Sequence, residues 1–300
     1  MDTVSVVTLA ISVFSVLANG ILLIILYQDP LKKFRTTTSY LIISLTFSDF
    51  ATGAVGCAFI LAPSHAATFA IFWATVLSSF FTIFFMSCER LVVVTYPLKA
   101  RNLITKGMVF LFIAANWLVS SVLGGLMGSF SMPQIDHLEF TLFCTILILV
   151  LVLVVIYFMI IWRTKHKPKF LRESIQSRSM HLIRREKRLT GVLFLLVAVL
   201  MVTVVPYLVG MAAFAGYRIF FGSGNYTHGF IVFATYYFPV ELLNFAVNPI
   251  IYAWRLPNYR KSLYFYLAKL PFGSKKFVMA GPRESFYSDN TNMIDKNAEK

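Results

Sequence analysis

The stretch FIVFATYYFPVELLNFAVNPIIYAW, Phe230–Trp254, carries a single acidic or basic side chain, Glu241. A helix needs about 20 largely apolar residues to cross the hydrocarbon core of a bilayer, so this stretch is long enough to do so. Its polar residues are regularly placed, because Glu241, Asn244, Asn248 and Tyr252 follow one another at steps of three, four and four. Such spacing puts them on one stripe of a helix. We therefore predict a membrane-spanning helix whose polar stripe faces protein or water.

Similar apolar stretches recur along the whole chain. Of its 300 residues, 58% are hydrophobic and 13% are charged, whereas a soluble domain is about one-quarter charged. Six further spans are predicted near Val4–Tyr27, Ser39–Leu61, Ala66–Val94, Met108–Gly128, Leu138–Trp162 and Leu189–Gly216. The expected fold class is an all-α membrane protein, a seven-transmembrane helix bundle.

The chain beyond the bundle is short and less apolar. Residues 1–254 are predicted to form the bundle, and residues 255–270 a short amphipathic helix on the cytoplasmic membrane surface. The basis is the segment LPNYRKSLYFYLAKL, Leu256–Leu270, in which aromatic and basic residues recur at helical spacing. Residues 271–300 are polar and mixed in charge, which favours a disordered cytoplasmic tail.

The basic residues give the chain a direction across the membrane. Its formal charge is +14, but the Lys and Arg residues lie in short segments between apolar stretches, which points away from nucleic-acid binding. With the amino terminus outside, Arg218 is the one residue of 27 Lys and Arg on the outer side. The positive-inside rule therefore predicts a multi-pass plasma-membrane protein with an extracellular amino terminus and a cytoplasmic carboxyl terminus. The sequon at Asn225, a glycosylation candidate, falls in a predicted outer loop.

The sequence points away from several classes of function. The three cysteines, Cys57, Cys88 and Cys144, each lie inside an apolar stretch, where they favour helix packing over a disulfide or metal site. No activated nucleophile, metal cluster or phosphate-binding loop is evident, so an enzyme is not expected. A transporter or channel that uses the polar column is a less favoured alternative, because no internal repeat is found.

Ionisable residues inside the spans are few, and a charge at mid-membrane is a functional hypothesis by default. Asp49 and Ser79, on the second and third spans, add to the stripe of Asn244 and Asn248. Together these four residues supply oxygens suited to a hard cation such as sodium.

Motifs on six of the predicted spans, in chain order, resemble those of the rhodopsin-like, or class A, G-protein-coupled receptors. The motif residues are Asn19-Gly20, Leu45-x-x-Ser48-Asp49, Glu89-Arg90, Trp117, Pro206 and Asn248-Pro249-x-x-Tyr252. Any one of these motifs is weak, but all six in register cover nearly the whole chain.

The resemblance implies a mechanism. Asp49, Ser79, Asn244 and Asn248 would form the allosteric sodium site of the family, and no other cofactor is expected. Arg90, preceded by Glu89, would bind Glu186 in the inactive state. On activation, it would move toward Tyr157 and Tyr252 while the sixth helix bends at Pro206 and swings outward. A heterotrimeric G protein would then contact Arg90, Pro97 and Leu98.

Several positions depart from the family pattern. Val204 stands where most members have a tryptophan, and Leu149 stands where the fifth helix usually has a proline. The outer loop Ser129–His137 is short, and no cysteine lies at the outer end of the third helix. These departures are similar to those of the branch that holds melanocortin, cannabinoid, lysophospholipid and adenosine receptors. They also leave open a constitutively active or non-signalling receptor-like protein.

The register of the motifs places an aromatic ligand pocket in the outer half of the bundle. Its predicted members are Phe72, Trp73, Val76, Tyr207, Met211, Phe238 and Glu241. Ordinary helix packing is the alternative for each. Phe72 stands where amine receptors carry an aspartate, which disfavours a typical biogenic amine, and the absence of a lysine from the seventh span disfavours retinal.

The ligand itself is predicted only by class, as a small molecule or a peptide. A cationic group of the ligand would pair with Glu241, helped by Glu139 and Asp136 at the outer rim; alternatively, Glu241 is protonated or joins the sodium network. The other expected partners are membrane lipid and arrestin, whose binding the tail residues Ser285, Tyr287, Ser288 and Thr291 would support. A nucleic-acid partner is not expected.

Overall fold

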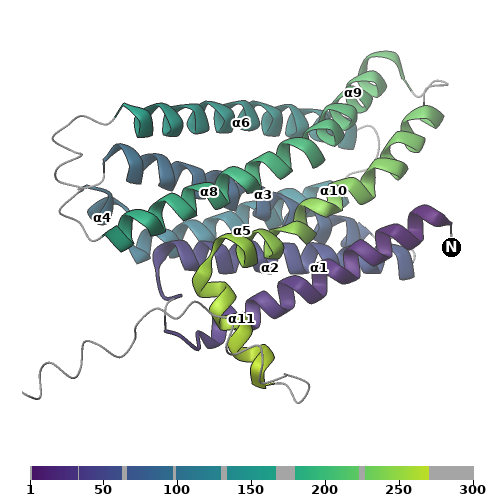
Figure 1. The fold of residues 1–300 in the computed structure, drawn as a ribbon. Helices are drawn as coiled ribbons and strands as arrows, with labels where there is room; N and C mark the ends of the chain where they lie inside the picture. The colour runs from purple at the N-terminus through teal and green to yellow at the C-terminus, as the bar shows by residue number, and fades with distance from the viewer. Residues whose placement is uncertain are drawn as a thin grey trace, which may run out of the picture.

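The computed structural model describes residues 2–32, 34–62, 66–96, 99–129, 134–166, 180–222 and 227–269, and every regular element within these ranges is a helix. Figure 1 shows the long helices running side by side as a bundle. In chain order the helices are α1 (Thr3–Gln28), α2 (Thr37–Leu61), α3 (Ala66–Thr95), α4 (Ala100–Leu103), α5 (Lys106–Ser129), α6 (Gln134–Lys165), α8 (Met180–Thr203), α9 (Val205–Phe221), α10 (Thr227–Arg255) and α11 (Pro257–Lys269).

Length and composition make this a membrane fold. Six helices, α1, α2, α3, α5, α6 and α10, are each long and apolar enough to cross a bilayer, and α8 with α9 makes a seventh span if the bent pair counts as one. The predicted class, an all-helical membrane protein with a short helix after the last span, is confirmed. The predicted span Val4–Tyr27 lies inside α1, and the other predicted spans differ from the observed helices by a few residues.

The sixth span, predicted near Leu189–Gly216 with a bend at Pro206 on activation, is made of two helices, α8 and α9. It is interrupted at Val204, and α8 and α9 are bent by 40° relative to each other. The cause is Pro206, which has no N–H to donate to the carbonyl of Val202, four residues earlier. The hydroxyl of Tyr237, on α10, donates to that carbonyl at 3.1 Å instead. A side chain of the seventh span thus supports the bend in the sixth.

The two ends of the bundle are named after the ends of the chain. At the N-side, where the chain begins, Asp2 caps α1 by accepting a hydrogen bond from the Ser5 amide at 3.0 Å. Hydrogen bonds from the side chain and the backbone of Ser5 hold the pKa of Asp2 below its usual value. At the opposite end, the C-side, α11 leaves α10 and runs at a steep angle to the bundle (Figure 1). The hydroxyl of Tyr266, on α11, donates a hydrogen bond to Gln28 at the end of α1.

Helix α3 is the packing centre, with α2, α5, α6 and α8 around it. Small residues let α5 approach it closely, because a Cβ atom at Gly124 would stand 2.4 Å from the backbone oxygen of Ala70, and one at Gly128 would stand 2.7 Å from that of Ala66. Close backbone approach through small residues is how membrane helices gain packing energy. This close approach fixes the position of α3, which carries residues of the polar column and of the charged cluster described below.

Candidate functional site: a polar column through the bundle

A buried carboxyl group lies at the centre of the column. The Asp49 side chain, on α2, is fully buried. The Ser79 hydroxyl, on α3, donates to Asp49 Oδ1 at 2.8 Å, and the Asn248 amide, on α10, donates to Oδ2 at 2.6 Å. Three spans therefore meet at one carboxyl group, and the side chains that donate to it within the described part of the chain, Ser79 and Asn248, are neutral.

The oxygens around Asp49 fit a sodium ion. The side-chain carbonyl oxygens of Asn244 and Asn248 are buried and have no hydrogen-bond partner within the described part of the chain. Carboxylate, hydroxyl and amide oxygens are the ligands that hard cations prefer. Asp49, Ser79 and Asn248 are in hydrogen-bond contact, whereas Asn244, buried one turn away on α10, takes part in none of these bonds.

The first span is tied to the same column through Asn19. Its amide donates to the backbone oxygens of Ser15 and of Phe245, on α10, both at 3.0 Å. The Phe245 carbonyl is four residues before Pro249, which has no N–H to offer it. Asn19 supplies that missing donor. The Ser15 hydroxyl donates in turn to the backbone oxygen of Asp49 at 3.3 Å.

A second polar cluster lies between α3 and α5 and was not predicted from the sequence. The Asn116 amide, on α5, donates to the backbone oxygen of Ser78 and to the hydroxyl of Thr82, both at 3.1 Å. The neighbouring motif residue Trp117 donates from Nε1 to the Ser44 hydroxyl, on α2, at 3.2 Å. An asparagine within an apolar span was the available signal. These bonds join α2, α3 and α5.

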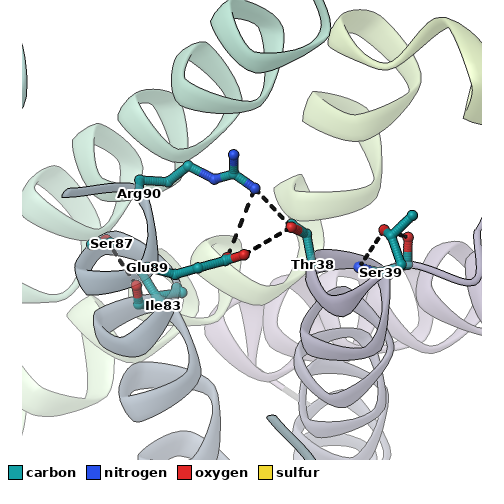
Figure 2. Close-up of polar contacts among 7 residues, drawn as sticks. Thr38, Ser39, Ile83, Ser87, Glu89 and Arg90 are labelled. Carbon is teal, nitrogen blue, oxygen red and sulfur yellow. Dashed lines mark hydrogen bonds and ion pairs between the residues drawn. The ribbon is translucent and has the colours of Figure 1, made fainter. Parts of the chain in front are cut away.

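At the C-side, Arg90 and Glu89 form a closed cluster with Thr38, at the start of α2 (Figure 2). Arg90 Nη2 donates to the Thr38 hydroxyl at 2.7 Å, and that hydroxyl donates to Glu89 Oε1 at 3.1 Å. The direct ion pair is longer, 3.8 Å between Arg90 Nη2 and Glu89 Oε2. All three side chains are buried. Thr38 was not among the predicted residues, because a threonine in a first helical turn usually serves only its own backbone.

The remaining predicted switch residues are only partly placed. The hydroxyls of Tyr157, on α6, and Ser87, on α3, lie 3.4 Å apart. The Tyr252 hydroxyl, on α10, is buried and has no hydrogen-bond partner among the described residues. Pro97, Leu98, Asn225 and the side chain of Glu186 lie outside the described residues.

The predicted pocket residues gather at the N-side, largely packed against one another. The rings of Phe72 and Phe238 lie 5.6 Å apart, with Phe59 against both, and Trp73 packs on Phe143 at 5.4 Å. Of the seven predicted residues, those that are buried are Phe72, Trp73, Val76, Tyr207 and Glu241, whereas Met211 and Phe238 are half-buried. Phe59 and Phe143 are additions to the predicted set.

The two carboxylates of the N-side rim already have a basic partner. Arg218, on α9, makes ion pairs with Asp136 and with Glu139, both on α6, the latter at 3.0 Å. From the sequence, these two acids were expected to help Glu241 bind a cationic group of the ligand. The structure assigns them to Arg218. Glu241 differs, because its Oε2 atom is buried and has no hydrogen-bond partner within the described ranges.

Ionisable residues buried within a bundle of membrane-spanning helices mark a functional site, and the family to which the chain belongs gives its class. Residues 18–252 match the family described as "7 transmembrane receptor (rhodopsin family)", so the chain belongs to this family. Its members are receptors that couple to G proteins rather than enzymes. The match favours no particular branch of the family. A search of curated proteins finds no match to the chain.

Proposed function

We propose that the protein is a ligand-activated receptor of the plasma membrane, with its N-side extracellular and its C-side cytoplasmic. The support for this orientation is the distribution of basic residues, because Arg218 is the one Lys or Arg that falls at the N-side. Ligand binding at the N-side would cause α8 to move outward at the C-side and open a crevice for a heterotrimeric G protein. Pro97 and Leu98, which follow α3 in sequence, would contact that G protein.

The observation that carries the proposal is the closed cluster of Arg90, Glu89 and Thr38. A neutral hydroxyl holds Arg90 more closely than the carboxylate does, at 2.7 Å against 3.8 Å. An arginine held in this way can exchange partners at little net cost, which a two-state switch requires. The Tyr252 hydroxyl, on α10, is buried and has no hydrogen-bond partner among the described residues, a state that costs about 1–3 kcal/mol. Movement of Arg90 toward Tyr252 and Tyr157 would relieve that cost.

We propose that Tyr237 connects ligand binding to the cluster around Arg90. Most family members carry a tryptophan at the position of Val204. The valine side chain has no polar atom through which a change could be transmitted. Here the Tyr237 hydroxyl, on α10, donates to the Val202 carbonyl beside the bend between α8 and α9. A ligand that moves Tyr237 would therefore alter the hydrogen bonding of the bend. Glu186, near the start of α8, is proposed as a further partner of Arg90 in the inactive state.

A sodium ion is proposed to modulate this switch. Asp49, Ser79 and Asn248 would hold it, with Asn244 contributing its unpartnered carbonyl oxygen. The ion would supply a positive charge beside a carboxylate that has only neutral donors. Asp49 and its neighbours fix α2, α3 and α10 in one arrangement, so binding there would favour the arrangement that the three helices adopt here.

The ligand is proposed to carry a cationic group that binds Glu241. The support is a buried carboxyl oxygen without a hydrogen-bond partner, placed beneath the aromatic residues of the N-side. A small molecule and the end of a peptide chain both satisfy this description. Replacement of Glu241 by Gln would keep the shape of the side chain and remove its charge. Arrestin is proposed as a second cytoplasmic partner, through tail residues that lie outside the described ranges.

G-protein dissociation in cells tests the proposal. It is measured without added ligand, across a panel of Gα subtypes, for wild type, Arg90→Ala and Glu186→Ala, with surface expression as the control. We expect a signal in wild type that rises in Glu186→Ala and disappears in Arg90→Ala. A high wild-type signal that Glu186→Ala does not raise would instead indicate a constitutively active receptor. Absence of signal in every variant at normal surface expression would favour a strictly ligand-gated receptor or a non-signalling or transport role, and electrophysiology would then test for transport.

A further inference from the structure

An apolar groove runs along the outer surface of the bundle between α9 and α10. Its lining includes Gly210, Ala213 and Phe214 of α9 and Gly229, Phe230 and Phe233 of α10, and its volume is about 400 Å³. Ala213 and Gly229 are exposed, so the groove opens away from the bundle interior. In a membrane-spanning bundle this surface faces lipid hydrocarbon. The volume lies within the range of small-molecule sites, about 300–1,000 Å³.

Stacked aromatic rings form the wall of the groove, and glycines make room for it. The rings of Phe214 and Phe230 are nearly parallel, with centroids 3.9 Å apart, and Phe233 follows Phe230 at 5.8 Å. A Cβ atom at Gly210 would stand 2.3 Å from the Phe233 ring. A Cβ atom at Gly229 would meet nothing within 4 Å. The groove therefore exists because these two positions lack side chains.

A row of residues on α10 leads from the groove to the buried carboxyl group. Gly229, Phe233, Tyr237 and Glu241 follow one another at steps of four, so they form a stripe about 18 Å long that winds from the exposed groove toward the bundle interior, where Glu241 is buried. Tyr237 stacks on Phe233 at 5.3 Å and also on Tyr207, across on α9, at 6.3 Å. This tyrosine layer separates the groove from Glu241.

The charges of the N-side select the chemistry of the occupant. Asp136 and Glu139 are both bound to Arg218, whose guanidinium also lies 4.5 Å from the centre of the Phe214 ring. Glu241 is the acid that ends the stripe with a buried oxygen lacking a partner in the described ranges. An ammonium group complements that carboxylate, and a long apolar body complements the groove.

We propose that the groove between α9 and α10 admits an amphiphilic amine from the bilayer, whose ammonium group binds Glu241 while its apolar body lies in the groove. The inference rests on the proposed receptor function and names the chemical class of its ligand. It also gives the ligand a route of action. To reach Glu241, the amine parts Tyr237 from Tyr207, which withdraws the Tyr237 hydroxyl from the Val202 carbonyl at the helix bend. Entry from the bilayer is thereby coupled to movement of α8.

Photolabelling of the full-length receptor in lipid bilayers tests the inference. The probe is a long-chain primary amine with a photoreactive group near the middle of its chain, compared with the same chain ending in an alcohol. We expect the amine to label peptides of α9 and α10, and an excess of unlabelled long-chain amine to compete. Gly229→Leu, which fills the groove, reduces this labelling at least about tenfold. Gly125→Leu is the matched control, because Gly125 also has open space at its Cβ and lies on α5, away from the groove. It leaves labelling unchanged.

Glu241→Gln tests the anchor separately. We expect the amine to label this variant no better than the alcohol does. Wild-type labelling of Gly229→Leu, or a retained preference for the amine in Glu241→Gln, overturns the inference. If Gly229→Leu fails a thermal-unfolding check, Ala213→Leu fills the groove from α9 and replaces it. Ligand-free G-protein dissociation is measured in the same preparations. If the wild-type receptor dissociates the G protein but shows no amine-selective labelling, this inference alone is wrong. If the wild-type receptor does not dissociate the G protein, the result counts against the proposed function.

Discussion

Two charged clusters near opposite ends of the bundle bind an arginine in different ways. At the N-side, Arg218 is clamped by two carboxylates of α6, with direct contacts to Asp136 and Glu139. At the C-side, Arg90 lies 3.8 Å from one carboxylate on its own helix, and its shorter bond goes to the neutral hydroxyl of Thr38. The first arrangement joins two helices by charge. The second includes a neutral hydroxyl, that of Thr38, among the partners of the arginine.

The difference indicates which of the two clusters keeps its arginine in place. Removal of one partner from a buried ion pair leaves an unpaired charge and is costly, about 3–5 kcal/mol. A hydrogen bond to a neutral hydroxyl contributes about 0.5–1.5 kcal/mol. The N-side cluster is therefore a permanent fastening of α6 to α9.

The largest effect is expected from Arg218→Ala. This change leaves Asp136 and Glu139, both 6% exposed, together without a counter-charge, and should lower the free energy of unfolding by about 3–5 kcal/mol. Thermal unfolding in detergent micelles measures it. Arg218→Lys keeps the charge and should retain most of the stability. Equal stability of wild type and Arg218→Ala would show that the cluster does not fasten the two helices.

Arg90→Ala should lose signalling more than stability. We expect agonist-free G-protein dissociation to fall at least about tenfold, equivalent to 1.4 kcal/mol, with a smaller loss of thermal stability than in Arg218→Ala. The reason is that Arg90 is the residue proposed to move between partners. The two variants are compared at matched surface expression. If Arg90→Ala were the less stable of the two and still signalled, the roles of the two clusters would be reversed.

Thr38→Val should raise basal signalling at a modest loss of stability. The change removes the hydroxyl that joins Arg90 to Glu89 and keeps the size of the side chain, so about 1 kcal/mol of stabilisation of the closed cluster is lost. A severalfold increase in ligand-free G-protein dissociation would follow. Thr46→Val is the matched control, because the buried Thr46 hydroxyl bonds only within α2, to the Ile42 backbone oxygen at 2.7 Å. A similar increase in both variants would remove Thr38 from the switch.

The smallest effect is expected from Glu139→Gln. Asp136 still neutralises Arg218 in this variant, and the glutamine can accept the hydrogen bond that Glu139 accepted, so stability should change by less than about 1 kcal/mol. Signalling should be unchanged. Thermal unfolding beside Arg218→Ala gives the comparison. A loss as large as that of Arg218→Ala would mean that Glu139, rather than the shared arginine, holds the cluster together.

Apolar length was enough to predict the spans, because a bilayer imposes a minimum on every helix that crosses it. A bend of the sixth helix at Pro206 was expected on activation, but the interruption of the helix at Val204 was not predicted, because a proline kinks some helices and interrupts others according to the side chains around it. Tyr237, which satisfies the Val202 carbonyl, lies on another helix. Only the folded chain brings the two together.

The candidate site shows the same limit. Asp49, Ser79 and Asn248 could be named from position and were found in contact, because each is a polar residue with few alternatives inside an apolar span. Thr38 and Asn116 bond across helices with equal effect, yet short polar residues of their kind often serve the local backbone. Arg218 was recognised as the outer basic residue, but its choice of Asp136 and Glu139 depends on how α6 and α9 are rotated.

Two of the three prolines in the last two spans, Pro206 and Pro249, have a consequence for how relatives of this chain should vary. Pro206 and Pro249 each deprive a carbonyl of its backbone donor, and side chains from neighbouring helices, Tyr237 and Asn19, supply the replacement. Each proline and its distant donor are thus one inherited unit of two positions. Where a relative has an ordinary residue in place of either proline, the selection that keeps the matching tyrosine or asparagine is relaxed. Covariation of 206 with 237, and of 249 with 19, is the trace that this would leave in a family alignment.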